Sequence, residues 1–509
     1  MDYYVAFSLV ILFALALFFI PSESRKKQQL YPKSYPLISC LVEFIRNRER
    51  IILWTSEIFD KLSTSTYVLQ IPFGRSVVFT RNPSNVQHIL KTRFYNYHKE
   101  STLTAALSDF FGKGLFLVDG AEWKSQRQFV RHVFDPKEYH AYISIAEEEL
   151  SDRLDPFLSK IAAQENACST TLDLQNTFRR LTFDLVCRIG FGFDPKYLLP
   201  SMPSTPLADT YETAVKLSMG RYTTLPLIWK AKKLFNAESE KKLGLVVEQV
   251  HKFLGSIIAK KKERLVMMED LEDKDVFARL LRRAQSEVQL NETFLVDEAV
   301  NFILGGQDTL CSALTWFFWL VSSNPNVDKE IAREVREKDG LSDMVYTHAS
   351  IYESMRLFPP IPVETKQVAE DDVWPDGTKV KKGMSIIYHI LAMGRSSELW
   401  GSDWAYFRPE RWLEKRSSDD DWNFIARDPF MYPVFQAGPR SCLGKEIAIV
   451  LMKMVAATIL KRFRVLPAKD NFSPHYDASM TSKMKHGFPG RCPFDSHKLM
   501  LIHIYMLHH

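Results

Sequence analysis

Apolar residues recur with the spacing of a helix along most of the chain. Three long segments carry apolar residues three and four positions apart, as expected of helices that bury one face: Leu172–Ile189, Glu240–Arg264 and Phe294–Ser322. Alternating runs are short, and Tyr67–Phe79 and Asp376–Ile387 each predict a β-hairpin. The pattern therefore predicts a mainly α fold with a small β region.

The N-terminus carries an uncharged apolar run from Tyr3 to Ile20, and basic residues at 25–27 follow it closely. Such a run is near the minimum of about 17 residues for a membrane-spanning helix. A cleaved signal peptide is the alternative, but the residues before the run include Asp2 and no base, and no small-residue cleavage pattern follows. We therefore expect residues 1–20 to be a membrane anchor, with the rest of the chain in the cytosol.

Beyond the anchor, the chain is expected to form one unit. The prolines within residues 21–39 cannot continue a helix and predict a stiff linker. No later stretch rich in proline, glycine or serine divides the sequence, and no internal repeat occurs. Residues 40–509 are therefore predicted to form a single domain, and a hydrophobic content of 46% supplies enough material for a large core.

Charge and cysteine content exclude several classes of protein. The net charge is only +5, from 66 basic and 61 acidic residues, and no dense basic stripe with interleaved aromatic residues occurs, so we expect no nucleic-acid partner. The 6 cysteines form no CxxC pair and have no histidines at zinc-site spacing. This sparse usage argues against a disulfide framework and favours a reducing, cytosol-facing environment.

The stretch FQAGPRSCLG, Phe435–Gly444, holds a single cysteine between two glycines, next to an arginine. A buried structural cysteine, half of a disulfide and a metal ligand are the alternatives. A thiolate that binds haem iron needs a tight loop, and Gly438 and Gly444 allow backbone to approach the porphyrin without a Cβ clash. Arg440 is placed to pair with a haem propionate. The structural-cysteine interpretation leaves both glycines and Arg440 unexplained.

Cys442 immediately precedes a predicted helix that runs to about Leu460. The dipole and the free amides at the start of a helix stabilise a thiolate, as iron ligation requires. One face of this helix is apolar and consists of Ile447, Leu451, Met454, Val455 and Ile459.

The segment Asn301–Val321 is apolar almost all round, so we expect a helix buried through the centre of the domain. Gly305 and Gly306 each destabilise such a helix by about 1 kcal/mol relative to alanine, which indicates a need for space. An acid and an alcohol follow at Asp308 and Thr309, and such a pair beside bound dioxygen can relay protons for O–O cleavage. Close packing at the glycines and an aspartate held by local hydrogen bonds form the alternative interpretation.

Glu353 and Arg356 are spaced i, i+3, so they share one face of a helix as an ion pair. Most such pairs are exposed and contribute little to stability. Here the flanking residues are apolar and indicate burial, and a buried pair needs a further partner, which Arg411 in the segment Phe407–Trp412 offers. We therefore expect a buried Glu353–Arg356–Arg411 network that braces the cysteine loop.

Trp123 and Arg127 lie one helical turn apart within Asp119–Phe134, on one face of a predicted helix. Together they can hold a propionate, with Arg127 as the ion partner. The alternative is a surface stack of the arginine on the indole.

Taken together, these segments resemble the cytochrome P-450 superfamily of haem-thiolate monooxygenases, and they follow that family's order over nearly the whole chain after the anchor. The resemblance implies the family's mainly α fold with a small β region. It also implies that haem b is the cofactor and that Cys442 is the proximal iron ligand. Asp308 and Thr309 are then expected to serve oxygen activation.

The resemblance further implies that Trp123, Arg127 and Arg440 contact the haem propionates, and that Lys366, in PPIPVETK, is another basic propionate partner. Electrons are expected from NADPH through a membrane-bound NADPH–cytochrome reductase. A basic docking face for the reductase is expected on the cysteine side of the molecule, at Lys445, Lys453, Lys461, Arg462 and Arg464.

More narrowly, the chain resembles the plant fatty-acid ω-hydroxylase clan, through MVYTHASIYESMRLFPPIPVETK, VWPDGTKVKKGM, AMGRSSELWG, FRPERW and GRYTTLPLIWKAKKL. Members oxidise terminal carbons of fatty acids, of a jasmonate–amino-acid conjugate, or of sterol side chains in steroidal-alkaloid and saponin pathways. The resemblance therefore implies a small lipophilic substrate. It also implies a single-pass protein of the endoplasmic reticulum membrane, in contact with membrane lipid, with its catalytic domain in the cytosol.

A terminal hydroxylase needs a narrow pocket, because a primary C–H bond is stronger than its neighbours and the protein must position the chain end. The resemblance places walls of this pocket at Phe110, Phe111, Leu304, Ile361, Val363, Met480 and Thr481. A fatty-acid carboxylate also calls for a basic anchor, for which the candidates are Lys99, Lys113 and Arg221.

The central helix reads GGQDTL and departs from the clan at Gly305, Gln307 and Leu310, where an alanine, an arginine and a second threonine are usual. The Asp308–Thr309 pair remains, so these departures concern the substrate rather than the chemistry. Two other functions stay open. One is a non-catalytic haem-binding membrane protein, which needs no proton relay, and the other is an enzyme that rearranges an oxygenated lipid without a reductase.

Overall fold

The computed structural model describes Pro32 and residues 40–71, 75–164, 171–267, 275–287, 292–338, 340–415, 422–478 and 480–494. The predicted anchor at 1–20 lies outside these ranges, as does the predicted linker at 21–39 apart from Pro32. Among the described residues, no helix combines the length and the apolar character needed to cross a membrane.

Helices dominate the described chain, as the apolar spacing predicts. The three long predicted segments correspond to α9 (Leu174–Phe191), α12 (Glu238–Val266) and α14 (Glu292–Ser322). The other α-helices are α2 (Leu41–Arg46), α3 (Ile51–Lys61), α4 (Pro83–Gln87), α5 (Ser101–Phe111), α6 (Gly120–Val130), α7 (Tyr139–Glu149), α8 (Asp155–Ala162), α10 (Pro206–Tyr222), α11 (Pro226–Leu234), α13 (Val276–Glu287), α15 (Pro325–Glu337), α16 (Val345–Leu357), α17 (Ile390–Gly394), α18 (Ser397–Trp400) and α19 (Lys445–Arg462).

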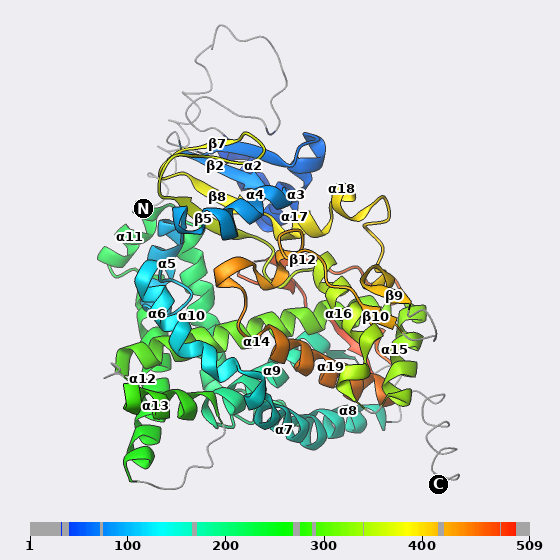
Figure 1. Cartoon of the computed structure of the whole chain (residues 1–509). Coiled ribbons are helices and arrows are strands. Elements are labelled where there is room, and N and C mark those ends of the chain that lie inside the picture. Colours follow the sequence, from blue (N-terminus) through cyan, green and yellow to red (C-terminus); the bar gives the residue numbers. More distant parts are fainter. Residues whose placement is uncertain are drawn as a thin grey trace, which may run out of the picture.

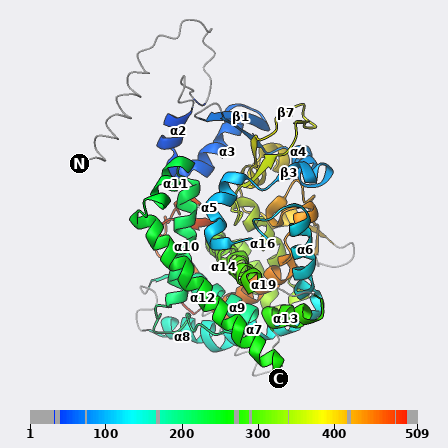
Figure 2. The ribbon, with the colours of Figure 1, turned by 90° about the vertical axis from the view of Figure 1, so that its left-hand side faces the viewer.

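Helix α14 is buried along most of its length, as its apolar sequence predicts. It crosses the middle of the molecule in Figure 1, and α5, α9, α12 and α16 pack against it. Figure 2 looks nearly along α14 and shows α10 and α12 on one flank and α6 on the other. Gly306 allows the close approach of α9, because a Cβ there would stand 2.7 Å from Cγ2 of Val186.

A five-stranded sheet covers one end of the helical body, at the top of Figure 1. Its strands follow the order β1 (Thr66–Ile71), β2 (Arg75–Thr80), β8 (Ser385–Tyr388), β5 (Glu364–Val368) and β3 (Tyr97–His98). The first predicted hairpin is confirmed, since β1 and β2 pair antiparallel with Tyr67 opposite Phe79. Strand β8 runs parallel to β2 and antiparallel to β5, so distant parts of the chain meet in this sheet.

Smaller ribbons complete the β region and join segments around the helices. Strand β9 pairs with β10, β14 lies between β11 and β4, and β12 pairs with β13. Their bounds are β4 (Leu172–Asp173), β9 (Leu413–Lys415), β10 (Trp422–Phe424), β11 (Leu466–Pro467), β12 (Tyr476–Ala478), β13 (Ser482–Met484) and β14 (Pro489–Arg491).

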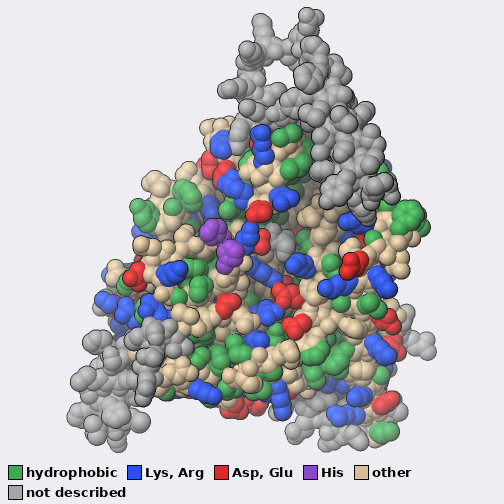
Figure 3. Space-filling model, turned by 180° about the vertical axis from the view of Figure 1, so that it is seen from behind, with side chains coloured by type: hydrophobic (Ala, Val, Ile, Leu, Met, Phe, Trp, Pro, Cys, Tyr) green, Lys and Arg blue, Asp and Glu red, His purple; other side chains and the backbone are tan. Residues whose placement is uncertain are grey.

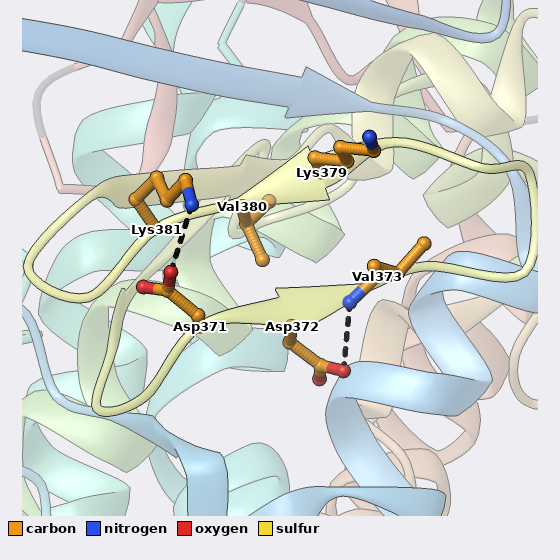
Figure 4. Close-up of a pocket in the computed structure, with 6 residues that line it drawn as sticks. All are labelled: Asp371, Asp372, Val373, Lys379, Val380 and Lys381. Carbon is orange, nitrogen blue, oxygen red and sulfur yellow. Dashed lines mark hydrogen bonds and ion pairs between the residues drawn. The ribbon is translucent and has the colours of Figure 1, made fainter.

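The second predicted hairpin, Asp376–Ile387, is wrong in its pairing. Strand β7 (Lys379–Val380) pairs with β6 (Asp372–Val373) upstream, and β8 joins the main sheet instead. Gly377 and Gly383 have positive φ values of 83° and 82°, so two turns stand where the sequence pattern indicates one. A surface pocket of about 360 Å³ beside the β6–β7 ribbon is lined mainly by charged side chains (Figure 4).

Gly394, at the end of α17, permits close contact with α16. A Cβ at this position would collide with the backbone oxygen of Arg356. Because backbone cannot yield as a flexible side chain does, we expect Gly394→Ala to lower the free energy of unfolding by about 1–3 kcal/mol. Gly244→Ala is the control, since no atom lies within 4 Å of a Cβ there. An exposed helix position of this kind should gain up to about 1 kcal/mol. Thermal unfolding measures both, and equal melting temperatures for the two variants would contradict the packing argument.

Candidate active site

The cysteine loop is shaped by one close backbone approach. Gly438 has a φ of +67°, and a Cβ there would collide with the carbonyl oxygen of Leu90, so only glycine fits. The amide of Cys442 donates to the carbonyl of Phe435 at 2.8 Å and closes the loop. Helix α19 follows and is held by its predicted apolar face, whose residues are all buried: Ile447, Leu451, Met454, Val455 and Ile459.

Cys442 differs from the other described cysteines. Its side chain is exposed, whereas theirs are buried. Burial within the surrounding protein nevertheless raises the pKa of Cys442, against smaller opposing effects of the Gly444 amide and the Arg127 charge. An exposed thiol in desolvated surroundings faces an internal space, which suits a ligand for iron and not a cysteine packed in a core.

Two arginines converge on Trp123 beside the cysteine loop. The Arg127 guanidinium lies 5.9 Å from the centre of the indole ring, and that of Arg440 lies 4.4 Å away. Arg127 donates to the carbonyl of Ser441 at 2.6 Å. Arg440 pairs with Asp119 at 2.5 Å. The structure therefore brings Trp123, Arg127 and Arg440, which are far apart in the sequence, to one edge of the loop.

Lys366, on β5, is buried with 3% of its surface exposed and pairs with Glu364 at 3.2 Å. Glu364 also pairs with Lys99 at 2.9 Å. Burial, and then the positive charge of Lys99, lower the pKa of Lys366 to about 7. The charge of Arg440 contributes to the same shift, which places Lys366 within reach of the arginine pair.

The basic side chains at this edge outnumber the carboxylates that pair with them, which are Glu364 and Asp119. Buried cations without counter-charge are unstable unless an anion joins them. The two propionates of haem b meet this need, and the internally exposed thiol of Cys442 meets the need of its iron. The residues present therefore fit a haem held by Cys442.

Gly305 is an exposed position in the middle of α14. The helix is continuous from Glu292 to Ser322, so neither glycine breaks it. Gly306 serves close packing against α9, whereas Gly305 leaves space that the ring of Phe116 borders. Thr309 donates its hydroxyl hydrogen to the carbonyl of Gly305 at 2.7 Å, so its oxygen lies on the same open side of the helix.

Asp308 points away from this open side. It is 8% exposed and lies 3.6 Å from the ammonium of Lys483, on β13. Burial raises the pKa of Asp308, while the charge of Lys483 lowers it. Gln307 and Leu310, two of the three departures from the clan, are 6% and 4% exposed, so both lie in the packed flank of the helix.

The Glu353–Arg356–Arg411 network is present in the structure. Glu353 and Arg356 are fully buried and share two hydrogen bonds of 2.7 Å, and Arg411 reaches Glu353 at 3.2 Å. Sequence reasoning missed a fourth member, Trp412, whose indole nitrogen donates to Glu353 at 2.9 Å. Arg356 also donates to backbone carbonyls, including that of Gly394 at 2.5 Å, so its charge is fully engaged.

The expected pocket walls fall into two groups. Leu304, Ile361, Val363 and Met480 are half-buried and so retain surface for a ligand. Phe110 and Phe111 instead lie in the hydrophobic core with 0% and 1% exposure, and Phe110 packs against Tyr211 and His251. Their placement in the pocket is wrong, because fully buried rings leave nothing for a substrate to touch. Thr481 is likewise only 1% exposed.

Two basic residues also differ from their expected placement. Lys453 is buried and donates to the carbonyl of Leu341 at 2.8 Å, so it is not part of a docking surface. Arg221 is 4% exposed and pairs with Asp109 and Glu240, so it is not open to a substrate carboxylate. On the face seen in Figure 3, basic and acidic side chains are interspersed.

A mainly helical domain that exposes one thiol among its described cysteines, beside unbalanced cations, has the features of a haem-thiolate protein. Comparison with known proteins gives the family. The family model for cytochrome P-450 matches residues 31–487, and the chain belongs to this family. Its cofactor is accordingly haem b, its electrons come from a reductase, and its reaction class is monooxygenation.

The chain is similar to several plant members of the family along nearly its whole length. Cytochrome P-450 94A2 of Vicia sativa is 46% identical over 470 residues, which are 90% of this chain and 90% of that protein. Cytochrome P-450 94A1 of Vicia sativa is 45% identical over 467 residues, 90% and 89% of the two chains. Cytochrome P-450 94B1 of Arabidopsis thaliana is 36% identical over 486 residues, 92% and 94% of the two chains.

Removal of Glu353 tests how far the site depends on its buried ion pair. Glu353→Ala leaves the buried Arg356 charge without a carboxylate, so we expect a loss of about 3–5 kcal/mol in unfolding free energy and no haem incorporation. Chemical denaturation and the haem-to-protein ratio measure the two effects.

The chain contains a matched control for this variant. Glu330 and Arg333 also form an i, i+3 ion pair, but their side chains are 45% and 51% exposed. Glu330→Ala is therefore expected to change stability by less than about 0.5 kcal/mol and to keep its haem. A haem-loaded and stable Glu353→Ala protein would contradict the proposed role of the network.

Proposed function

We propose that this monooxygenase hydroxylates the terminal carbon of a lipid aliphatic chain, either a fatty acid or a sterol side chain. The proposal rests on the open position at Gly305, whose carbonyl accepts a hydrogen bond from Thr309. The resemblance places apolar residues of neighbouring segments around this position, and four of them are half-buried. The resemblance to the plant fatty-acid ω-hydroxylase clan supports the same choice.

Contacts of Ser482 support the placing of these segments around one pocket. Its backbone oxygen accepts from the hydroxyl of Ser312, on α14, at 2.6 Å. Its amide donates to the carbonyl of Pro360 at 2.8 Å. The segments that carry Met480 and Ile361 are thereby tied to each other and to the central helix, as a pocket with walls from all three requires.

Haem held by Cys442 supplies the oxidising power that, with dioxygen and electrons from NADPH, exchanges the hydrogen of an unactivated C–H bond for hydroxyl. The protein must position the chain end and deliver protons. Thr309 already donates its hydrogen to Gly305, so its oxygen lone pairs remain for a proton donor on the open side. Asp308 is assigned as the acid of this relay; its carboxylate pairs with Lys483 in this structure, so it must turn toward Thr309 to deliver a proton.

Of the three candidate residues for binding a fatty-acid carboxylate, the ion pairs in the structure leave one. Lys99 pairs with Glu364, and Arg221 pairs with Asp109 and Glu240. Lys113 is exposed, and no ion pair joins it to another residue in the described part of the chain. We therefore assign the carboxylate contact to Lys113 if the substrate is a fatty acid.

The N-terminal segment and the surface around α19 suggest where the protein lies in the cell and which redox partner it binds. Segment 1–20 is assigned as a single-pass anchor in the endoplasmic reticulum membrane, with the domain in the cytosol, because basic residues 25–27 follow it. NADPH–cytochrome reductase is assigned to the surface that carries Lys445, Lys461 and Arg464, which retain accessible charge on or just after α19.

The test of the function uses microsomes that contain this protein and a plant reductase. A fatty acid, a hydroxylated cholesterol and a jasmonate conjugate compete in one reaction with NADPH, and mass spectrometry identifies the oxidised carbon. A terminally hydroxylated fatty acid or sterol supports the proposal, and the preferred product decides between them. Oxidation only at internal carbons, or product formation without the reductase, would show that the reaction is a different one.

Thr309→Ala tests the proton relay. We expect NADPH consumption to continue while product per NADPH falls at least about tenfold, because the oxygen that positions the proton donor is lost. Thr315→Ala is the control: Thr315 lies on the same helix and makes the same type of bond, to the carbonyl of Cys311 at 2.7 Å, but it is fully buried. Equal coupling in both variants would place the relay elsewhere.

A further inference from the structure

One residue of the cysteine loop has a backbone conformation that side chains rarely adopt. Gln436 has φ and ψ values of 59° and 178°, in a region of backbone space that glycine populates almost alone. Such a conformation costs free energy and persists only where the surrounding contacts hold it. Gln436 lies between Phe435 and Cys442, so the strain is stored in the loop that presents the thiol.

The peptide between Phe435 and Gln436 explains why the strain is needed. The carbonyl of Phe435 accepts from the amide of Cys442 at 2.8 Å, and the amide of Gln436 donates to the carbonyl of Pro433 at 3.0 Å. A peptide is planar, so its carbonyl and its N–H turn together. Relief of the positive φ at Gln436 would turn this peptide over and take its carbonyl away from Cys442. The strained conformation therefore preserves the hydrogen bond of the Cys442 amide.

The side chain of Gln436 is held by Tyr388. The Tyr388 hydroxyl donates to Oε1 of Gln436 at 2.5 Å. Burial raises the pKa of Tyr388 well above its usual range, so this hydroxyl stays protonated and remains a donor. The bond opposes any turn of the strained backbone that would move the Gln436 side chain.

Tyr388 is itself fixed at the centre of the five-stranded sheet. It lies on β8, opposite Glu364 of β5 and Thr80 of β2. Its side chain has no exposed surface. A ring packed in this way has little freedom to move, so its hydroxyl is a rigid reference point for the cysteine loop.

The loop passes from one hydrophobic cluster to another at Gln436. Phe435 packs against the largest cluster of the molecule, whereas Ala437 is buried in a second cluster that contains Tyr388 and Leu90. The collision that excludes a Cβ at Gly438 is with the carbonyl oxygen of the same Leu90. The direction that the chain takes at Gln436 is thus set by the part of the molecule that carries Tyr388.

We propose that Tyr388 is a positioning residue for the iron ligand. Through its bond to Gln436 it keeps the Phe435–Gln436 peptide turned toward the Cys442 amide, and so fixes how Cys442 is presented to the haem. Without the hydroxyl, the strained peptide turns over in part of the molecules, and Cys442 is held less firmly as a thiolate ligand. The inference goes beyond the proposed function, because it concerns the ligand and holds whichever lipid is oxidised.

Tyr388→Phe removes the hydroxyl and keeps the buried ring. Hydrogen exchange of the loop peptide that contains the Cys442 amide should quicken about tenfold, the effect of one net hydrogen bond. The ratio of thiolate-ligated to thiol-ligated haem should fall about tenfold for the same reason. Mass spectrometry of the haem-loaded full chain measures the exchange. The absorption spectrum of the ferrous carbon monoxide complex, which differs between thiolate and neutral thiol ligands, measures the ratio.

A second substitution separates this role from a general loss of packing. Gln436→Gly removes the strain, because glycine adopts the same conformation without a Cβ clash. In the double variant Tyr388→Phe/Gln436→Gly, the thiolate-to-thiol ratio should therefore return to within about twofold of the wild type. A tyrosine that served stability alone would give effects that add, and the ratio would stay low.

The chain supplies a control for each substitution. Ser63 also has a positive φ, of 49°, but it is exposed on the turn after α3, so Ser63→Gly should not restore the ratio in Tyr388→Phe. Tyr142 is another buried tyrosine, and its hydroxyl donates to the carbonyl of Val133 at 2.9 Å instead of to the cysteine loop. Tyr142→Phe should leave both the ratio and the exchange of the loop unchanged.

Two results would overturn the proposal: an unchanged ratio in Tyr388→Phe, or a ratio in the double variant as low as in Tyr388→Phe alone. Should Tyr388→Phe fail to fold, Gln436→Met and Gln436→Gly decide. Methionine keeps the strain and offers only a weak acceptor, so its ratio should fall about tenfold, whereas glycine should keep the wild-type ratio. Equal ratios in these two variants would also overturn the proposal. None of these measurements needs a lipid, so a failure of the proposed function is seen separately.

Discussion

The burial of α14 is the constraint on which the rest of the site depends. A buried helix is stabilised when its polar side chains find partners, because an unpaired polar group in such surroundings is unfavourable. Asp297 and Asn301 therefore fix a loop, Asp308 draws Lys483 from a distant strand, and Ser312 bonds to Ser482. The polar residues of one helix thus decide where two other segments lie, the loop after α5 and strand β13. The exposed Gly305 is where this enclosure stops, and the chemistry is assigned to that place.

On the cysteine side, by contrast, the chain does not supply a carboxylate for every buried cation. There the chain leaves cations in excess of carboxylates around Trp123 and Lys366, at positions that burial makes unfavourable for charge. An arrangement of this kind is stable only with an added anion, so the apoprotein is expected to be less stable than the loaded protein by the binding free energy of the cofactor. The buried Glu353–Arg356 pair differs, since its charges are satisfied within the chain and serve as a brace.

Local signals predicted the parts of the structure that local physics controls. The helical period gave the long helices to within two residues at each end, and the β1–β2 hairpin has the predicted pairing. The charged i, i+3 pattern with apolar flanks gave the Glu353–Arg356 pair. The glycine at 438 was predicted for clearance of the porphyrin, whereas the structure explains it by a collision of any Cβ with the carbonyl of Leu90.

The wrong predictions share a different cause, which is that long-range contacts decide them. Whether Arg221 is free depends on Asp109, 112 positions away, and no spacing rule connects the two. Lys453 has the sequence appearance of a surface lysine but donates to a carbonyl of another segment. Phe116 escaped notice for the same reason. Its neighbours Phe110 and Phe111 look equally apolar in sequence, and only the attachment to α14 leaves Phe116 at the site while they enter the core.

The position of the clan departures bears on how substrate choice is set. Gln307 and Leu310 lie in the packed flank of α14, on neither side of the open turn, so neither side chain is placed to touch a substrate. A change at these positions can reach the pocket only by shifting neighbours, and packed interiors resist such shifts. An exposed side chain on an anchored backbone contacts the ligand directly. Because its backbone is already fixed, little free energy is lost in ordering it when the ligand binds. By this reasoning the substrate is selected by residues such as Val363 and by the departure at Gly305, which lies on the open side of the helix. The departures at Gln307 and Leu310 accompany that selection without causing it.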